Sequence, residues 1–264
     1  MLVMGVLNIT PDSFYDGGRY TSAEDAVERG LRMAQEGADI IDIGGESTRP
    51  GSRAISASEE LERVLPVIEG VHRRSDVLLS VDTTKASVAE EAIACGASIV
   101  NDISALRFDH KMAAVIGKGE RFVILMHMLG TPETMQIDPS YVDPVSEIKL
   151  FLAERIDAAV RAGIEREKII VDPGIGFGKR LKDNLAILMK LTDLTDLEAP
   201  VMIGLSRKSF FGRLLDLPAG ERLEATIAAN AIAIANGADI IRVHDVKEGR
   251  RTADVAFRLR HDHH

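Results

Sequence analysis

Polar residues that could bind or polarise a ligand follow short apolar runs all along this sequence. The runs span residues 2–7, 40–43, 77–81, 99–100, 122–126, 169–171, 201–205 and 240–243. The polar residues at or near their ends are Asn8, Asp42 and Glu46, Asp82, Asn101, His127, Asp172, Ser206 to Lys208, and Arg242 with His244. Carboxylates, amides and cations of this kind can act together only if the fold brings the ends of the runs to one face.

Three of these residues suit a flat, nitrogen-rich ring. Asp172 ends a buried run and opens the turn 172–179, whose glycines permit positive φ and close approach of the backbone. Asp82 and Asn101 end two other runs. Taken singly, Asp82 could cap a helix, Asn101 could serve a turn, and the glycine-rich turn could be a simple tight connection. Together they match the guanidine-like edge of a pterin or purine, since buried carboxylates require hydrogen-bonded partners.

Cationic residues gather in other segments. Arg49 lies in the loop 46–52, and Lys208 follows a strand and precedes a helix start, where free backbone N–H groups favour anions. Arg242 and His244 flank Val243 on the last run, so the two-residue period of a strand places both on one face. This set suits phosphate or pyrophosphate. We interpret His127 as a hydrogen-bonded core residue.

Helix-like stretches separate the runs and predict the fold that positions these groups. A glycine followed by a β-branched run recurs at 37–41, 96–100 and 237–241, which is typical of a helix end leading into a buried parallel strand. The predicted helices span 23–35, 58–72, 87–94, 145–162, 181–191, 223–236 and 254–260, with a short candidate at 109–116. The sequence therefore predicts an α/β fold, a single (β/α)8 TIM barrel, with a doubly wound open sheet as the alternative.

Three of the predicted loops are long and rich in Gly, Pro, Ser and Thr. They follow the first, second and fifth strands and span residues 10–21, 44–56 and 128–144. Because the C-terminal ends of the strands form the catalytic face of such barrels, long loops at that face indicate function.

Composition limits the classes of partner and the number of domains. A chain of 264 residues fits one barrel domain over residues 1–264, and the net charge of −9 argues against nucleic acid or an anionic membrane as partner. The single cysteine, Cys95, excludes an internal disulfide, and we expect it to be a buried small apolar residue. There is no apolar run of membrane-spanning length and no leader pattern, so we expect a cytoplasmic protein. Residues 261–264 read as a tail or tag remnant.

The ordered motifs are similar to those of the dihydropteroate synthase family. The matching segments are 4–14, 44–51, 81–83, 101–103, 126–132, 172–179, 206–208 and 242–245. The resemblance runs from Met4 to Asp245 in order and implies a (β/α)8 barrel. It also leads us to expect residues before the first strand, which begins here almost at Met1.

The resemblance implies a role for each matching residue. The pterin-binding residues would be Asp82, Asn101, Ile103, Met126, Asp172, Phe177, Lys208 and Arg242. The pyrophosphate would contact Asn8, Thr48, Arg49, Arg242 and His244, with Asn8 also at the metal. The aminobenzoate pocket would include Phe14, Pro50 and Ser209. Arg49, Lys208, Arg242, His244 and Asp16 would be the catalytic residues.

The implied reaction joins 6-hydroxymethyl-7,8-dihydropterin pyrophosphate to p-aminobenzoate with Mg²⁺, in an enzyme that is expected to be a homodimer. Two alternatives share the pterin pocket. A pterin-dependent methyltransferase barrel would have no use for the segment 47–50 or for the anion site at Arg242 and His244. A non-catalytic pterin-binding relative would not need the intact loops.

Overall fold

In the computed structural model of the chain, the structure describes residues 1–9, 23–48, 52 and 54–261. The strands are β1 (Leu2–Asn8), β2 (Ile40–Gly44), β3 (Leu78–Asp82), β4 (Ile99–Asp102), β5 (Phe122–Met126), β6 (Ile169–Asp172), β7 (Met202–Gly204) and β8 (Ile240–Val243). The α-helices are α1 (Ala23–Gln35), α2 (Ala57–His72), α3 (Ala86–Ala94), α4 (Met112–Ile116), α5 (Pro144–Arg161), α6 (Leu181–Met189), α7 (Ser209–Leu215), α8 (Leu223–Ala235) and α9 (Val246–His261). Short 3-10 helices span Arg166–Lys168, Leu191–Leu197 and Ala219–Glu221.

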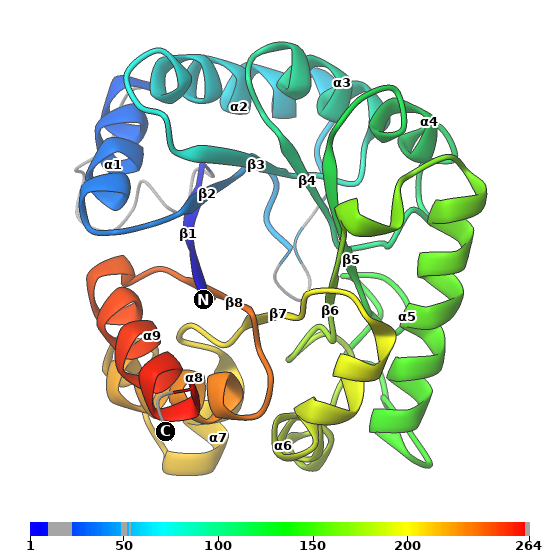
Figure 1. The fold of residues 1–264 in the computed structure, drawn as a ribbon, viewed down its shortest axis with the longest axis vertical. Coiled ribbons are helices and arrows are strands. Elements are labelled where there is room, and N and C mark those ends of the chain that lie inside the picture. Colours follow the sequence, from blue (N-terminus) through cyan, green and yellow to red (C-terminus); the bar gives the residue numbers. More distant parts are fainter. Residues whose placement is uncertain (10–22, 49–51, 53, 262–264) are drawn as a thin grey trace.

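The strands form a closed parallel barrel surrounded by helices (Figure 1). Seven of the neighbouring pairs follow the order β6-β5-β4-β3-β2-β1-β8-β7. The remaining seam between β6 and β7 is closed by a parallel bridge between Val171 and Val201, where the Val171 amide donates to the Pro200 carbonyl at 2.9 Å. The predicted (β/α)8 barrel is confirmed, and the open doubly wound sheet was wrong because both sheet edges pair.

Side chains inside the barrel lie in layers, because every second residue of a strand points inward. The lower layer is apolar and consists of Met4, Ile40, Ile99, Ile124, Ile170, Met202 and Ile240. Two residues further along these strands, the inward positions are occupied by Val6, Asp42, Asn101, Met126, Asp172, Gly204 and Arg242. The barrel interior therefore changes from an apolar layer to one that carries charged and amide side chains within two residues along the strands.

The residues between these positions point outward and form the larger core with the helices. Ile41, Ile43 and Val81 are completely buried, as are Val64 and Ile68 of α2. Burial of a side chain of this size contributes roughly 1.5–3 kcal/mol. This helix-covered core fixes the strands and, through them, the polar layer within.

Helix bounds agree with the sequence-based prediction within two residues, except near the chain's end and at α4 and α7. α9 begins at Val246 rather than at residue 254, and its glycine, Gly249, obscured the helical pattern. A Cβ on Gly249 would lie 2.8 Å from Val243 Cγ2, so close packing on β8 requires this glycine despite its low helix propensity. Cys95 is only partly buried, contrary to expectation.

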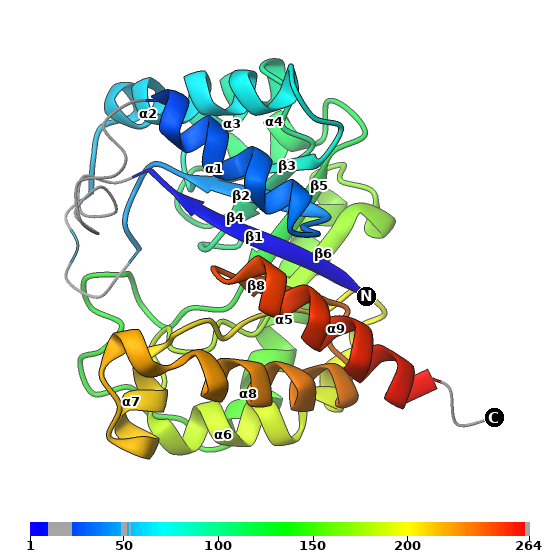
Figure 2. The same cartoon turned by 90° about the vertical axis from the view of Figure 1, so that its left-hand side faces the viewer.

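The described parts of the loops after β2 and β5 lie at the end of the barrel toward which β1 runs from the N-terminus (Figure 2). Residues 10–22, most of the first loop, lie outside the described residues, as do 49–51 and 53 of the second and the tail 262–264. The loop after β5 packs on the glycine-rich turn, since Gln136 Nε2 and the Tyr141 hydroxyl donate to the Gly176 and Gly178 carbonyls, each at 2.8 Å. No helix in the described part of the chain is long and apolar enough to cross a membrane.

Candidate active site

Arg242 lies at the centre of a buried charge network inside the barrel. Its Nε donates to Asp42 Oδ2 at 2.7 Å, and its Nη2 donates to Asp82 Oδ2 at 2.8 Å. Asn101 Nδ2 donates to the same oxygen of Asp42 at 2.9 Å. The strands β2, β3, β4 and β8 thus supply one connected cluster inside the barrel, near their C-terminal ends.

Asp42 is the residue of this cluster to which the sequence-based interpretation gave no role. Its side chain is completely buried, and it lies in the middle of the run Ile40–Gly44. A carboxylate in an otherwise apolar strand is costly to bury alone, so it required a cationic partner. That requirement is the signal that could have identified it.

The cluster also leaves acceptor atoms unused. Within the described residues, Asp42 Oδ1, Asn101 Oδ1 and the hydroxyl of Ser80 are buried without a hydrogen-bond partner. Buried polar groups are satisfied in most proteins, and leaving one unpaired costs about 1–3 kcal/mol. The barrel interior therefore offers acceptors to the donors of a ligand or an ordered water.

Burial and charge act in opposite directions on this cluster. Burial raises the pKa of Asp82 to about 7, with Arg242 opposing and the negative charge of Asp42 reinforcing the shift. Burial disfavours the charged form of Arg242 as well, but Asp42 and Asp82 hold the pKa of its guanidinium above the usual value. Arg242 thus remains cationic while Asp82 changes protonation near neutral pH.

A second set of ionisable groups consists of Asp172, at the end of β6, and Lys208, in the segment after β7. Asp172 Oδ1 accepts from the Gly174 amide at 2.7 Å, and burial raises the pKa of Asp172 while Lys208 opposes the shift. Lys208 Nζ donates to the Ile175 carbonyl and lies 4.8 Å above the Phe177 ring centroid. Burial lowers the pKa of Lys208 to about 8, with Arg242 contributing in the same direction.

The glycine-rich turn after β6 is fixed by close backbone packing. Gly174 has a φ of 66°, and a Cβ there would lie 2.0 Å from the His127 carbonyl oxygen, so no other residue fits. Beneath the turn, the buried Lys179 Nζ lies 2.8 Å from the Gly174 carbonyl and 2.9 Å from His127 Nδ1. Burial and the charge of Lys179 lower the pKa of His127 to about 2. His127 is therefore a neutral, hydrogen-bonded core residue, as the sequence indicated.

An apolar wall faces these charges. Ile103, Met126, Met128 and Met135 pack as one buried cluster, with Phe177 partly buried against it. Flat apolar surfaces beside directed polar groups are typical of small-molecule sites. The structure thus brings together all eight residues that the resemblance assigns to the pterin.

The anion-binding candidates are only partly brought together. His244 Nδ1 is 2.9 Å from Ser206 Oγ, next to Arg242 along β8. Asn8 lies near Asp82 across Gly44, where a Cβ would be 3.7 Å from Asn8 Oδ1 and 3.4 Å from Asp82 Cβ. Ser209 is exposed at the start of α7. Four assigned residues lie outside the described residues, namely Phe14, Asp16, Arg49 and Pro50.

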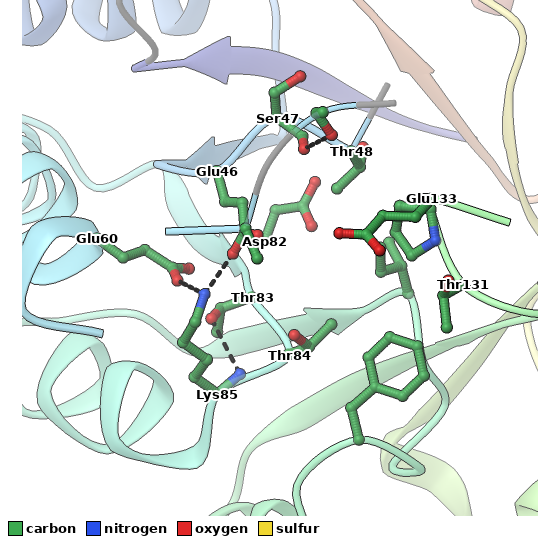
Figure 3. A pocket seen from close by; sticks show the side chains of 15 residues that line it. Glu46, Ser47, Thr48, Glu60, Asp82, Thr83, Thr84, Lys85, Thr131 and Glu133 are labelled. Atoms are coloured by element: carbon green, nitrogen blue, oxygen red, sulfur yellow. Dashed lines mark hydrogen bonds and ion pairs between the residues drawn. The ribbon is translucent and has the colours of Figure 1, made fainter. Parts of the chain in front are cut away.

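A cavity of about 290 Å³ opens beside the network, between the loops that follow β2, β3, β4 and β5. Thr48 and Asp82 line it together with Ile103. Figure 3 shows Glu60 and Lys85 on one side of this cavity and Glu133 on the opposite side. The cavity therefore lies between the pterin-side residues and the first residues of the second loop, which directly follow β2.

The described residues include no group of three or more His, Cys, Asp or Glu side chains that could hold a metal ion. An all-protein metal cage is thus absent from this part of the chain. A Mg²⁺ ion delivered with a pyrophosphate would keep water and phosphate ligands and would need only one or two protein oxygens. Asn8 is the protein oxygen donor that the resemblance assigns to it.

Comparison with known proteins agrees with this geometry. Residues 4–244 match the family described as pterin binding enzyme. A Bacillus subtilis dihydropteroate synthase is 49% identical over 254 residues, covering 96% of this chain and 87% of that protein. The Synechocystis sp. dihydropteroate synthase is 46% identical over 258 residues, covering 97% and 89%.

Solved structures give the same result. The Yersinia pestis dihydropteroate synthase with a sulfonamide drug complex has a TM-score of 0.92 and 45% identity, covering 98% of this chain and 94% of that one. The Xanthomonas albilineans dihydropteroate synthase with 4-aminobenzoic acid has a TM-score of 0.92 and 44% identity, covering 98% and 93%. Sequence and structure together show that the chain belongs to the pterin binding enzyme family and, within it, to the dihydropteroate synthases.

Proposed function

We propose that the site transfers the (7,8-dihydropterin-6-yl)methyl group of 6-hydroxymethyl-7,8-dihydropterin pyrophosphate to the amino group of p-aminobenzoate, giving 7,8-dihydropteroate and pyrophosphate. The bond between the exocyclic methylene carbon and the pyrophosphate oxygen breaks, and its electron pair leaves with pyrophosphate. The aniline nitrogen then forms the new C–N bond and releases a proton to solvent.

The observation that carries this proposal is the buried acceptor set in the barrel. Asp82, Asn101 and Asp172 lie at the ends of strands around an apolar wall, and Asn101 Oδ1 has no partner within the described part of the chain. A pterin offers several ring and amino N–H donors along one edge, which these acceptors would bind as charge-assisted hydrogen bonds. Lys208 would donate from the other side, and Phe177 and Met126 would contact the ring faces.

Departure of pyrophosphate would be assisted by the cations above the pterin. Arg242 lies on β8 and His244 directly follows that strand, and Thr48 and Arg49 belong to the second loop. Cations preorganised at the position where negative charge develops stabilise the transition state without reorganisation. Mg²⁺ bound with the pyrophosphate at Asn8 would neutralise further charge on the leaving group. The ring nitrogens would meanwhile stabilise the methylene cation, with Asp16 adding negative potential.

The aminobenzoate would bind last, above the pterin. We assign Phe14, Pro50 and Ser209 to its pocket, and the exposed Ser209 at the open end of the barrel supports that placement. Holding the aniline nitrogen over the methylene carbon replaces a bimolecular encounter with an intramolecular one.

Aminobenzoate-dependent release of pyrophosphate is the test of this function. Purified protein with the pterin pyrophosphate and Mg²⁺ should release pyrophosphate only when p-aminobenzoate is added, and pteroate should appear in equal amount. Pterin binding without turnover would instead identify a non-catalytic pterin-binding protein. Methyl transfer from a methylated pterin would identify a methyltransferase.

We also propose that the protein works as a homodimer in the cytoplasm. Large apolar side chains are exposed on adjacent helices, including Ile232 of α8 and Val255 and Leu259 of α9. Such residues favour a contact that buries them. Analytical ultracentrifugation should give twice the chain mass, and Val255→Lys should shift the protein toward the monomer if this face forms the contact.

A further inference from the structure

Three charged residues form a compact cluster beside the cavity. Lys85 Nζ contacts Glu46 Oε2 and lies 2.5 Å from Glu60 Oε2 (Figure 3). The cluster joins three elements that are separate in the sequence: the end of β2, the first turns of α2 and the start of α3. None of these residues belongs to the pterin, pyrophosphate or aminobenzoate sets assigned above.

Two members of the cluster have fixed positions. The Lys85 amide donates to Thr83 Oγ1 at 3.2 Å, and the Lys85 carbonyl accepts from the amides of Val88 and Ala89 at the start of α3. Glu60 is completely buried within α2, and the other oxygen of its carboxylate has no partner within the described residues. The buried charge of Glu60 therefore holds the ammonium of Lys85 in place.

The third member, Glu46, precedes the residues assigned to the pyrophosphate. It lies two positions before Thr48, and Lys85 lies three positions after Asp82. Its neighbour Gly45 is held from the same helix, since Arg63 Nη1 donates to the Gly45 carbonyl at 2.8 Å. Both carboxylates raise the pKa of Lys85 although burial opposes the shift, so the ammonium stays charged.

We propose that Lys85 is a positioning residue that, through Glu46, sets the place of Thr48 relative to the pterin-side carboxylate of Asp82. The inference rests on the proposed function, because Thr48 is taken there to bind pyrophosphate. Lys85 does not contact the substrate. Held by the buried carboxylate described above, Lys85 links the end of the strand that carries Asp82 to the start of the second loop through one ion pair.

Removal of the Glu46 side chain tests this role without exposing an unpaired buried charge, because Lys85 keeps Glu60. For Glu46→Ala we expect kcat with the pterin pyrophosphate to fall about tenfold, the scale of a modest misplacement of a reacting group. The dissociation constant of a bare pterin, which has no pyrophosphate, should change less than about twofold. Glu90→Ala is the matched control, since Glu90 pairs with Lys118 at 3.1 Å on the outer surface. It should change neither value.

Amide hydrogen exchange gives a readout that does not require turnover. Exchange of a peptide covering residues 44–48 should accelerate about tenfold or more in Glu46→Ala and remain unchanged in Glu90→Ala. The double variant Lys85→Met/Glu60→Gln, which leaves no buried charge unpaired, should reproduce the kinetic and exchange effects of Glu46→Ala. The single variant Lys85→Arg keeps the cation and should largely retain the wild-type kcat and the wild-type exchange rate.

Unchanged exchange at 44–48 in Glu46→Ala, or faster exchange with a wild-type kcat, would overturn the positioning role. Absence of pteroate formation by the wild-type protein would instead overturn the proposed function. In that case the exchange comparison would still show whether Lys85 and Glu46 order the segment that carries Thr48.

Discussion

The guanidinium of Arg242 and the carboxylate of Asp42 meet at a single oxygen, with Arg242 Nε 2.7 Å and Nη2 2.6 Å from Asp42 Oδ2. Nη2 also donates to Asp82, so one cation is shared by two carboxylates. Asp42 therefore has two effects on the site. It fixes the orientation of Arg242, and its negative charge raises the pKa of Asp82.

Neutralising Asp42 should shift the acid side of the pterin-binding profile. Asp82 is protonated below its pKa of about 7, so the affinity of the wild-type protein for a bare pterin should fall as the pH drops through that value. In Asp42→Asn the neighbouring negative charge is gone and Arg242 is left to Asp82, and both changes lower the pKa of Asp82. Calorimetry from pH 5 to 8 should show the fall moved to lower pH. A fall at the wild-type pH would contradict the coupling.

Lys208 should control the alkaline side of the same profile. Burial lowers its pKa to about 8, and a lysine loses its charge as the pH rises above its pKa. Pterin affinity should therefore decline from pH 8 to 9.5. In Lys208→Arg the guanidinium stays charged over this range, so its decline should be smaller. Ionisation of the ligand affects both proteins equally, and parallel profiles would show that Lys208 is not a donor to the pterin.

Asp172 should anchor the pterin at a cost in stability. Loss of a charge-assisted pair in a buried site is worth about 2–3 kcal/mol, or roughly 30- to 100-fold in affinity. We expect Asp172→Ala to weaken pterin binding by that factor and to leave the melting temperature near or above that of the wild type, because burial already disfavours this carboxylate. Calorimetry and thermal unfolding check the two parts, and an unchanged affinity would remove Asp172 from the pterin site.

Aminobenzoate should bind only after the pterin and pyrophosphate. Phe14 and Pro50 belong to the first and second loops, whereas the pterin-side residues lie on the barrel strands. We expect no measurable binding of p-aminobenzoate to the free protein and clear binding once a pterin, pyrophosphate and Mg²⁺ are present. Titrations under both conditions measure this, and equal affinities would indicate a preformed pocket.

Arg49 should act on the chemical step. A contact made with the departing pyrophosphate and not with the ring lowers kcat and kcat/KM together when it is removed. For Arg49→Ala we expect a fall of about 10²-fold or more in both, with little change in bare-pterin affinity. Steady-state kinetics and calorimetry on the same variant decide it. Much weaker pterin binding with normal turnover at saturation would place Arg49 in the wall of the pterin pocket.

Much of this site could be predicted from local sequence signals. Asp82, Asn101 and Asp172 each end an apolar run, and parallel strands in a barrel open onto one face, so their convergence follows from order and spacing alone. The two-residue period of the last strand likewise placed Arg242 and His244 on one face. The order of the motifs also identified the family, because motif order can be determined without a structure.

The partners of these residues were decided by the closed barrel. Asp42 lies 200 residues from Arg242, and the two meet because β1 pairs with both β2 and β8 in a register that places Val6 beside Asp42 and Met4 beside Arg242. Lys85 reaches Glu46 and Glu60 only once α2 packs beside β3 and α3. Such contacts depend on strand register and helix packing across the whole chain, which residue type and spacing do not encode locally. The sequence thus determined which groups are present at the mouth of the barrel, and the tertiary structure determined which of them are paired and which remain open to a ligand.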